Sequence, residues 1–129
     1  MKEIPLLSVE NTGSILRLTL MRGGQRNPLS AAMLEAIVAA LEAAAADKSV
    51  RAIVIAGEAP GVCGGHDLKE MTSHRTDADG GRAFYEALFA RCSEMMQMIV
   101  AHPKIVIAEV NGIATAAGCQ LVAACDMAV

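Results

Sequence analysis

Two short segments carry the residue types that could support chemistry in this chain. CGGHDL at 63–68 follows an apolar run that ends at 57, and TAAGCQL at 115–121 follows the apolar run 104–110. Each leads from a loop of small residues into a helix-like stretch, whose first N–H groups are unpaired and can face an anion or a developing oxyanion. Small side chains also let a ligand approach the backbone closely. Plain tight turns would need the same residues, so the pattern by itself leaves both interpretations open.

The polar side chains in and beside these segments limit the chemistry further. Gln120 stands where a carboxylate would indicate acid/base catalysis, but an amide can only orient a water molecule or, as a buried group, satisfy backbone partners. The His66 imidazole could serve as an acid or base near neutral pH. We expect Asp67 to fix its loop or cap the next helix, and Lys69 and Glu70 to pair on the surface of that helix.

The hydrophobic pattern places both segments behind buried strands of an α/β domain. Ser30 is positioned to cap a helix in which apolar residues recur at i, i+3, i+4 and i+7, and Pro103 ends a second helix. The alternation of strands and helices indicates βαβ units, in which ligands collect beyond the carboxyl ends of the strands. We expect strands at 14–20, 50–57 and 104–110, helices at 31–47, 82–102 and after 116, and the start of a further strand at 127–129.

Composition excludes several classes of function. The chain has 129 residues, 53% of them hydrophobic, a formal net charge of -3 and no basic stripe, so we expect one domain and no nucleic-acid partner. No apolar run reaches the length of a membrane span, and the first residues show no targeting pattern, which predicts a soluble protein that does not bind membranes.

The cysteines and one buried acid complete the candidate groups. The four cysteines lack metal-ligand spacing, which predicts no metal site and favours buried free thiols in a reducing cytoplasm. Cys119 is more readily interpreted as a packing residue than as a reactive thiol. Glu109 lies in a predicted buried strand, where it could face the sheet edge or a partner subunit, or replace a missing general base.

Two long stretches resemble a known family. DKSVRAIVIAGEAPGVCGGHDLKEM at 47–71 and HPKIVIAEVNGIATAAGCQLVAACDMAV at 102–129 are similar to the first half of the crotonase superfamily, the enoyl-CoA hydratase/isomerase fold. One branch of the superfamily shares the wording GHDLKE and AAGCQLVA. The resemblance covers essentially all of residues 1–129 and implies one crotonase-like domain, a spiral of ββα units represented by its N-terminal core, with the C-terminal part absent.

The resemblance also implies a binding site for an acyl-CoA thioester, with coenzyme A as part of the substrate and no other cofactor. The backbone N–H groups of His66 and Ala117 correspond to the two donors of the family's oxyanion hole, which polarise the thioester carbonyl. Arg26, and less readily Arg22, could meet the phosphates of coenzyme A. Its remaining parts are expected along the first motif, at Gly64, Gly65, Asp67 and Leu68.

The same resemblance makes the activity an open question. Gln120 occupies the position of a catalytic glutamate in typical hydratases, and the family's second glutamate falls beyond Val129. The sequence therefore predicts a hydratase/isomerase homologue, a lyase or isomerase of fatty acid metabolism whose ordinary hydratase turnover is doubtful. The alternatives are a non-catalytic acyl-CoA-binding or regulatory relative and an inactive fragment. Family members assemble as trimers or as dimers of trimers, so a homo-oligomer is expected.

Overall fold

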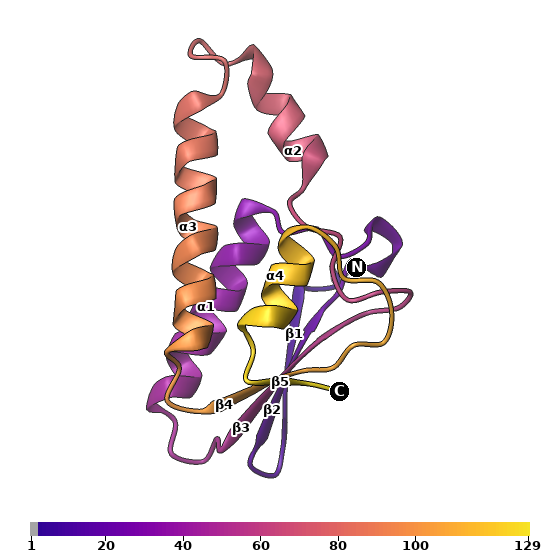
Figure 1. The fold of residues 1–129 in the computed structure, drawn as a ribbon, viewed down its shortest axis with the longest axis vertical. Helices are drawn as coiled ribbons and strands as arrows, with labels where there is room; N and C mark the ends of the chain where they lie inside the picture. Colours follow the sequence, from indigo (N-terminus) through magenta and orange to yellow (C-terminus); the bar gives the residue numbers. More distant parts are fainter. Residues whose placement is uncertain (1–2) are drawn as a thin grey trace.

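A five-stranded sheet organises the computed structural model, which describes residues 3–129 (Figure 1). The strands lie in the order β1-β2-β3-β4-β5, with β1 and β2 antiparallel and all later neighbours parallel. The strands span Leu7–Thr12 (β1), Ile15–Leu20 (β2), Ala52–Gly57 (β3), Ile105–Ala108 (β4) and Met127–Ala128 (β5). The parallel strands confirm the predicted α/β class.

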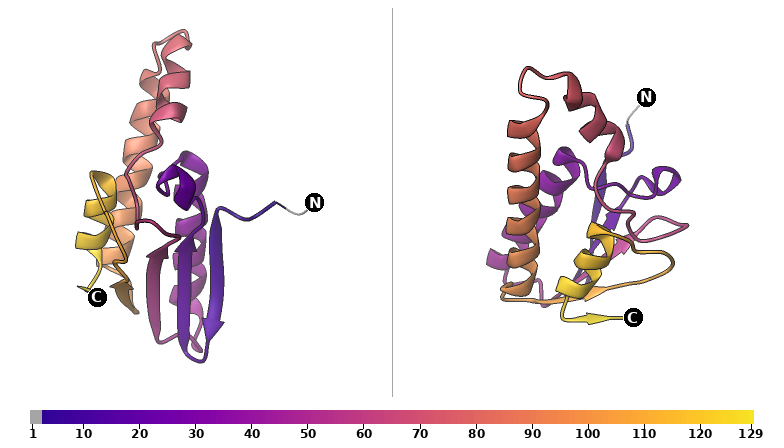
Figure 2. Two further views of the ribbon diagram at one scale, coloured as in Figure 1. Left: turned by 90° about the vertical axis from the view of Figure 1, so that its right-hand side faces the viewer. Right: turned by 45° about the horizontal axis from the view of Figure 1, so that its top comes forward.

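Helices connect the parallel strands and form a second layer (Figures 1 and 2). The α-helices span Ala31–Ala46 (α1), Leu68–Ser73 (α2), Arg82–Val100 (α3) and Ala117–Ala124 (α4), and short 3-10 helices span Gly23–Gln25 (η1) and His74–Thr76 (η2). Helix α1 packs on β1 and β2, α3 packs against both α1 and α4, and α4 contacts β5. Helix α2 and the first turns of α3 project beyond the sheet (Figure 1).

The core lies between the sheet and these helices. Apolar side chains at the helical period of α1 and α3 meet the inward-facing residues of β2 and β3, because each layer has one apolar face to bury. The largest fully buried side chains include Leu18, Leu20, Ile53, Ile55, Leu34, Ile37, Leu41, Met95, Ile99 and Leu121. This packing holds the carboxyl ends of β3 and β4 side by side.

The helix termini follow the predicted signals. Ser30 precedes α1, and its hydroxyl accepts the backbone N–H of Met33 at 3.1 Å. Helix α3 ends at Val100, three residues before Pro103, within the distance at which a proline terminates a helix.

The strands differ from expectation at two places. Strand β1 was not predicted, because beyond Leu7 and Ser8 its residues are exposed and show no apolar alternation. The run 104–110 was predicted as a buried strand, but β4 is shorter and Ile105 is 55% exposed. A hydrophobic run in the sequence indicates a strand, but it does not show whether other elements of the structure cover that strand and bury its side chains.

Replacing Ser30 by alanine should lower the free energy of unfolding by about 1 kcal/mol, because the N–H of Met33 loses its acceptor. Urea denaturation followed by circular dichroism measures the change. Ser93→Ala, an exposed position within α3, is the matched control and should shift stability by less than about 0.5 kcal/mol. Equal effects of the two substitutions would contradict the capping role.

Candidate active site at the carboxyl edge of the sheet

The loops after β3 and β4 are joined to each other by backbone hydrogen bonds. The Val62 N–H donates to the carbonyl of Ile113 at 2.9 Å, and the Thr115 N–H donates to the carbonyl of Cys63 at 3.1 Å. A Cβ on Gly118 would lie 2.1 Å from the Cys63 carbonyl oxygen, so only glycine allows this approach. The two segments singled out in the sequence therefore form one structure.

A third loop, residues 21–30, closes the site from the other side. The Gly64 N–H donates to the Arg26 carbonyl at 2.7 Å, and the Leu29 N–H donates to the Gly65 carbonyl at 2.8 Å. Arg26 has φ 67°, in the left-handed region. These bonds align the backbone of Arg26 with the glycine-rich segment, which brings a basic side chain to the site.

Asn27 fixes this third loop, a role that sequence analysis missed. Its side chain is 0% exposed, its oxygen accepts the Arg22 N–H at 2.8 Å, and its nitrogen donates to the carbonyls of Glu58, Gly61 and Val62 at 3.0, 3.2 and 3.1 Å. The buried amide is thus fully satisfied, as burial requires. Asn27 also adopts φ 49°, a conformation that asparagine tolerates better than most residues. The only feature of the sequence that could have indicated this role is the presence of an asparagine in a glycine-rich loop.

The two predicted oxyanion donors lie at this junction. Within residues 3–129, neither the His66 N–H nor the Ala117 N–H donates to a protein acceptor. The loops meet here, because a Cβ built on Gly65 would lie 3.3 Å from the Ala117 nitrogen and 3.1 Å from the Ala116 Cβ. Ala117 is the first residue of α4, where an N–H has no partner in the helix. Both amides are therefore free to donate to a ligand.

A cleft of about 430 Å³ lies beside His66 and contains all the predicted substrate-binding residues. Lys69 also lines this cleft and supplies a second cation beside Arg26. The sequence analysis had assigned Lys69 to a surface pair with Glu70. A smaller cleft of about 280 Å³ shares Arg26 and Gly64 and extends to Thr115. The larger cleft is lined by Gly24, Gln25, Arg26, Pro28, Gly64, Gly65, His66, Asp67, Leu68 and Lys69.

Several neighbouring polar groups have structural partners. Asp67 caps α2 by accepting the Glu70 N–H at 3.1 Å, as predicted. Glu70 instead accepts the Ala31 N–H at the start of α1, at 2.9 Å, so the expected surface pair with Lys69 is wrong. Arg22 donates to the carbonyls of Ile4 and Pro5 and anchors the N-terminal segment rather than lining the main cleft.

Gln120 lies elsewhere. Its side chain is exposed and lines a groove between α3 and α4 together with Ser93, Met96 and Gln97, and neither His66 nor Ala117 lines this groove. The interpretation as a buried, satisfied amide is therefore wrong. The structure brings His66, Ala117 and the cleft residues together, and it does not bring the Gln120 side chain to them.

Glu109 forms an ion pair with Arg17 of β2, in which the Arg17 guanidinium donates a hydrogen bond to the Glu109 carboxylate. This bond raises the pKa of the Arg17 guanidinium. The carboxylate thus reaches from the residue after β4 across β3 to β2, and it lines neither of the two clefts described above. Within residues 3–129, no cluster of three His, Cys, Asp or Glu side chains could hold a metal ion. The same residues include no helix long and apolar enough to cross a membrane.

The four cysteines are free but differ in exposure. Cys63 and Cys92 are buried as predicted, and burial raises the pKa of both thiols. Burial also raises the pKa of Cys125 to about 11. Cys119 is exposed, which corrects the expectation of a buried packing residue.

Comparison with known proteins agrees with this geometry. The enoyl-CoA hydratase/isomerase family model matches residues 10–129. The chain is 43% identical over 124 residues to the mouse protein "Enoyl-CoA hydratase domain-containing protein 3, mitochondrial". The aligned region covers 96% of this chain and 40% of the mouse protein. It is 37% identical over 123 residues to 2,3-dehydroadipyl-CoA hydratase of Escherichia coli, covering 95% of this chain and 45% of that protein.

Solved structures show the same relationship. An enoyl-CoA hydratase from Mycobacterium smegmatis superposes with a TM-score of 0.88 at 49% identity, covering 97% of this chain and 47% of that one. Human enoyl coenzyme A hydratase domain-containing protein 3 gives a TM-score of 0.86 at 39% identity, covering 96% of this chain and 47% of the human chain.

The chain therefore belongs to the enoyl-CoA hydratase/isomerase family and has the crotonase fold. Within the superfamily it falls in the branch of enoyl-CoA hydratase domain-containing protein 3, as the shared motif wording predicted. It spans 40% to 47% of the length of the relatives described above.

Replacing Asn27 by alanine should lower the free energy of unfolding by roughly 3 kcal/mol, because buried backbone groups lose their partner. Asn27→Gly keeps the left-handed backbone accessible and removes only the amide, so it should recover a small part of this loss. Urea unfolding compares the two variants with Asn11→Ala, an exposed control in β1. A change below about 1 kcal/mol at Asn27 would contradict its role in fixing the loop.

Iodoacetamide labelling of the native protein at pH 8 should modify Cys119 first and leave Cys63, Cys92 and Cys125 protected. The raised pKa of Cys125, about 11, means that the folded state favours its protonated thiol. The stability that this provides is complete below the pKa of an unfolded thiol, about 8.5, and is lost as pH rises toward 11.

Peptide mass mapping identifies the labelled thiol, and labelling in urea should reach all four. Repeating the native labelling from pH 8 to pH 11 should show Cys125 reacting only toward the upper end of the range. Equal native labelling of Cys119 and Cys125 at pH 8 would contradict this assignment.

Proposed function

We propose that this chain binds an acyl-CoA thioester, with its carbonyl oxygen accepting hydrogen bonds from the backbone N–H groups of His66 and Ala117. The observation that carries the proposal is that both amides lack a protein acceptor within residues 3–129 and lie where two strand-end loops meet. A pair of preorganised donors stabilises the negative charge of an enolate, and removing one such donor costs about 2.7 to 4 kcal/mol in a protease.

The adjoining cleft supports coenzyme A as the carrier of the acyl group. Arg26 and Lys69 supply positive charge for its phosphates, and Gly64 and Gly65 offer backbone without side chains in the way. Asp67 and Leu68 line the same cleft and complete the proposed contacts. Coenzyme A enters as part of the substrate, and the proposed binding requires no separate cofactor or metal.

The proposed reaction class is hydration or isomerisation of an enoyl thioester through an enolate, within fatty acid metabolism. Gln120 makes ordinary hydratase turnover slow, because it supplies no acid or base and its side chain lies in the groove between α3 and α4. This same placement favours a second candidate, a non-catalytic acyl-CoA binder that retains the oxyanion loops.

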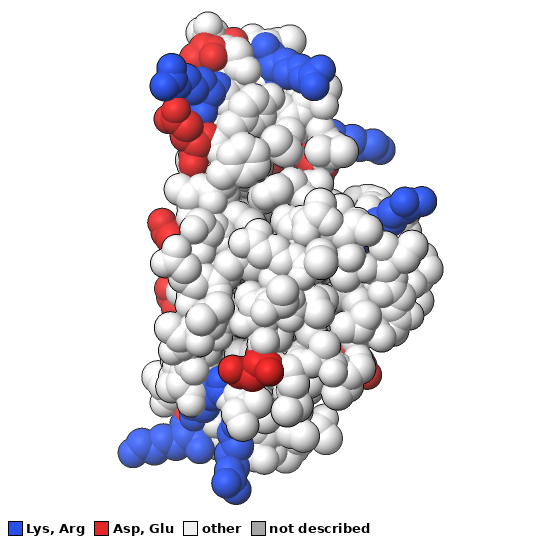
Figure 3. Space-filling view, in the orientation of Figure 1, with Lys and Arg blue, Asp and Glu red and all other residues white. Residues whose placement is uncertain are grey.

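We further propose that the chain acts in an oligomer, a trimer or a dimer of trimers, in the cytoplasm. Large apolar side chains are exposed at Val100, Ile105, Ile113, Met127 and Val129, and surface of this kind favours association. Few charged side chains interrupt the face shown in Figure 3, and those that are visible lie mostly at its margin. The vertebrate relatives carry "mitochondrial" in their names, so the proposed compartment differs from theirs.

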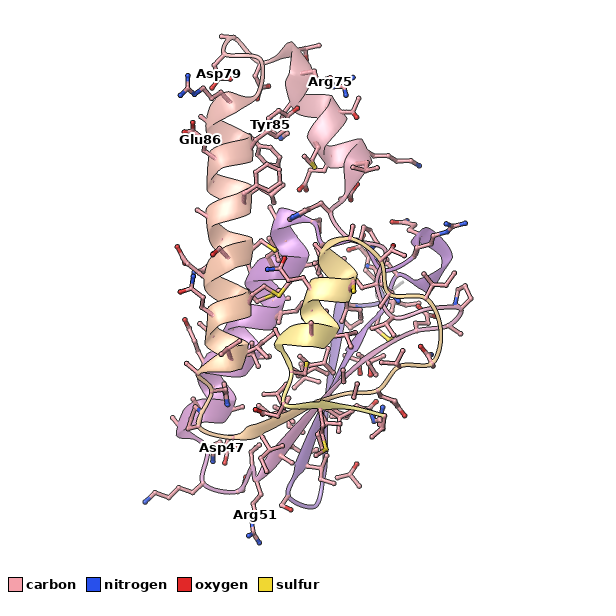
Figure 4. All side chains as sticks on the ribbon, viewed as in Figure 1. Asp47, Arg51, Arg75, Asp79, Tyr85 and Glu86 are labelled. Carbon is pink, nitrogen blue, oxygen red and sulfur yellow. The ribbon has the colours of Figure 1, made fainter. Side chains whose placement is uncertain are left out.

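Binding of butyryl-CoA, measured by calorimetry, tests the proposed function. Arg26→Ala should weaken binding about threefold to tenfold, and more at low salt, because a phosphate loses its cation. Arg75→Ala is the matched control, since Arg75 lies on η2 at the far tip of the molecule (Figure 4). Absence of saturable binding to the wild-type chain would overturn the proposal.

Crotonyl-CoA hydration separates the two candidate functions. If the missing carboxylate alone limits turnover, and if the side chain at position 120 turns from the groove toward the bound thioester, Gln120→Glu should raise the rate by about a hundredfold, the lower range for acid/base catalysis. Gln97→Glu, in the same groove, should leave the rate unchanged. Rapid hydration by the wild-type chain would show that the amide argument is wrong, and no gain in Gln120→Glu would favour the non-catalytic binder.

A further inference from the structure

The imidazole of His66 is held in place but incompletely paired. Its ring meets Phe89 of α3 edge-on, with centroids 5.2 Å apart and an interplanar angle of 70°. Its Nδ1 is buried without a hydrogen-bond partner, and no other buried side-chain nitrogen or oxygen within residues 3–129 shares this condition. Native proteins rarely leave such atoms unpaired, so this one requires an explanation.

The surroundings of the ring decide where its proton lies. A neutral imidazole carries one N–H and one lone pair. A buried N–H without an acceptor is more costly than a buried lone pair, which places the proton on Nε2. Within the described residues Nε2 has no protein partner and is not among the buried unpaired atoms. His66 therefore offers two donors, its backbone N–H and its Nε2–H.

The position of this second donor limits what it can bind. If the backbone N–H of His66 meets the thioester carbonyl, the ring of the same residue can reach only atoms a few bonds from that carbonyl. We propose, building on the proposed function, that Nε2–H of His66 donates to an oxygen on the third carbon of the acyl chain. His66 is then a specificity-determining residue that selects 3-hydroxyacyl thioesters over unsubstituted ones.

Phe89 supports the selection of 3-hydroxyacyl thioesters because its contact limits the positions that the His66 imidazole can adopt. The edge-on contact orients the imidazole, and an aromatic face is a much weaker hydrogen-bond acceptor than a hydroxyl oxygen. An acyl chain without oxygen would leave Nε2–H unpaired once water is excluded, and a site built to hydrogen-bond a hydroxyl discriminates against ligands that lack it.

The test compares butyryl-CoA with 3-hydroxybutyryl-CoA, which have the same chain length and differ by one hydroxyl. Calorimetry on the wild-type chain should show about tenfold tighter binding of the hydroxylated thioester. His66→Phe keeps a ring beside Phe89 and keeps the backbone N–H, but it removes the ring donor. This variant should lose the preference and bind both thioesters with equal affinity.

His74→Phe is the matched control, because His74 stacks on Phe84 and pairs with Asp77 outside the cleft. It should retain the tenfold preference. Butyryl-CoA binding without any preference in the wild type, or a preference that survives in His66→Phe, would overturn the inference and leave the proposed function intact. If neither thioester binds, the proposed function itself fails and the inference fails with it.

A second measurement stands even if His66→Phe does not fold. Nitrogen-15 NMR of the wild-type imidazole should show the proton on Nε2, and the Nε2 resonance should respond differently to 3-hydroxybutyryl-CoA and to butyryl-CoA, because only the first supplies an acceptor. A proton on Nδ1, or equal responses to the two ligands, would contradict the assignment.

Discussion

The site depends on one buried amide, the side chain of Asn27. It joins the loop after β2 to the loop after β3 through one accepted and three donated hydrogen bonds. A buried polar group is tolerated only when it is paired, and a network of this kind rigidifies the segments that it connects. With Asn27 in place, the backbone of Arg26 can pair with Gly64, and the basic side chain stands at the cleft.

Close approach of backbone to backbone is the second condition for the site. Gly118 packs on the carbonyl of Cys63 at a distance that excludes any side chain, and Gly65 adopts φ +96° beside Ala116. These contacts, and the hydrogen bonds between the loops, use the neighbouring backbone groups and leave the N–H groups of His66 and Ala117 available. Donors fixed in this way need no reorganisation when charge develops on a ligand, which is the physical basis of an oxyanion hole.

The outer parts of the molecule are held by separate interactions. Arg91 of α3 pairs with Glu35 of α1 and with Glu94, and these carboxylates raise the pKa of the Arg91 guanidinium. At the projecting tip, Tyr85 points from α3 toward α2 and donates to the Met71 carbonyl at 2.5 Å (Figure 4). Phe89 lies between Tyr85 and Arg91 on α3 and meets His66 edge-on, so the ring environment of the site involves a helix that contributes neither of the two backbone donors.

The sequence by itself determined the α/β class, the main helices and parallel strands, the cap at Ser30 and the family to which the chain belongs. These features follow from hydrophobic periodicity, capping residues and motif sequences, which are local properties of the chain. Through the resemblance the sequence also predicted that His66, Ala117, Arg26 and the glycine-rich residues belong to one site. It did not reveal β1, whose exposed residues lack an apolar pattern.

Only the tertiary structure decided the roles that depend on partners distant in sequence. Asn27 meets carbonyls more than thirty residues away, Glu70 accepts from Ala31, and the His66 ring lies against Phe89. The exposure of Gln120 and of Cys119 was likewise fixed by how the helices pack. Local sequence cannot specify such contacts, because burial and hydrogen-bond pairing arise only when the loops and helices are assembled around the sheet.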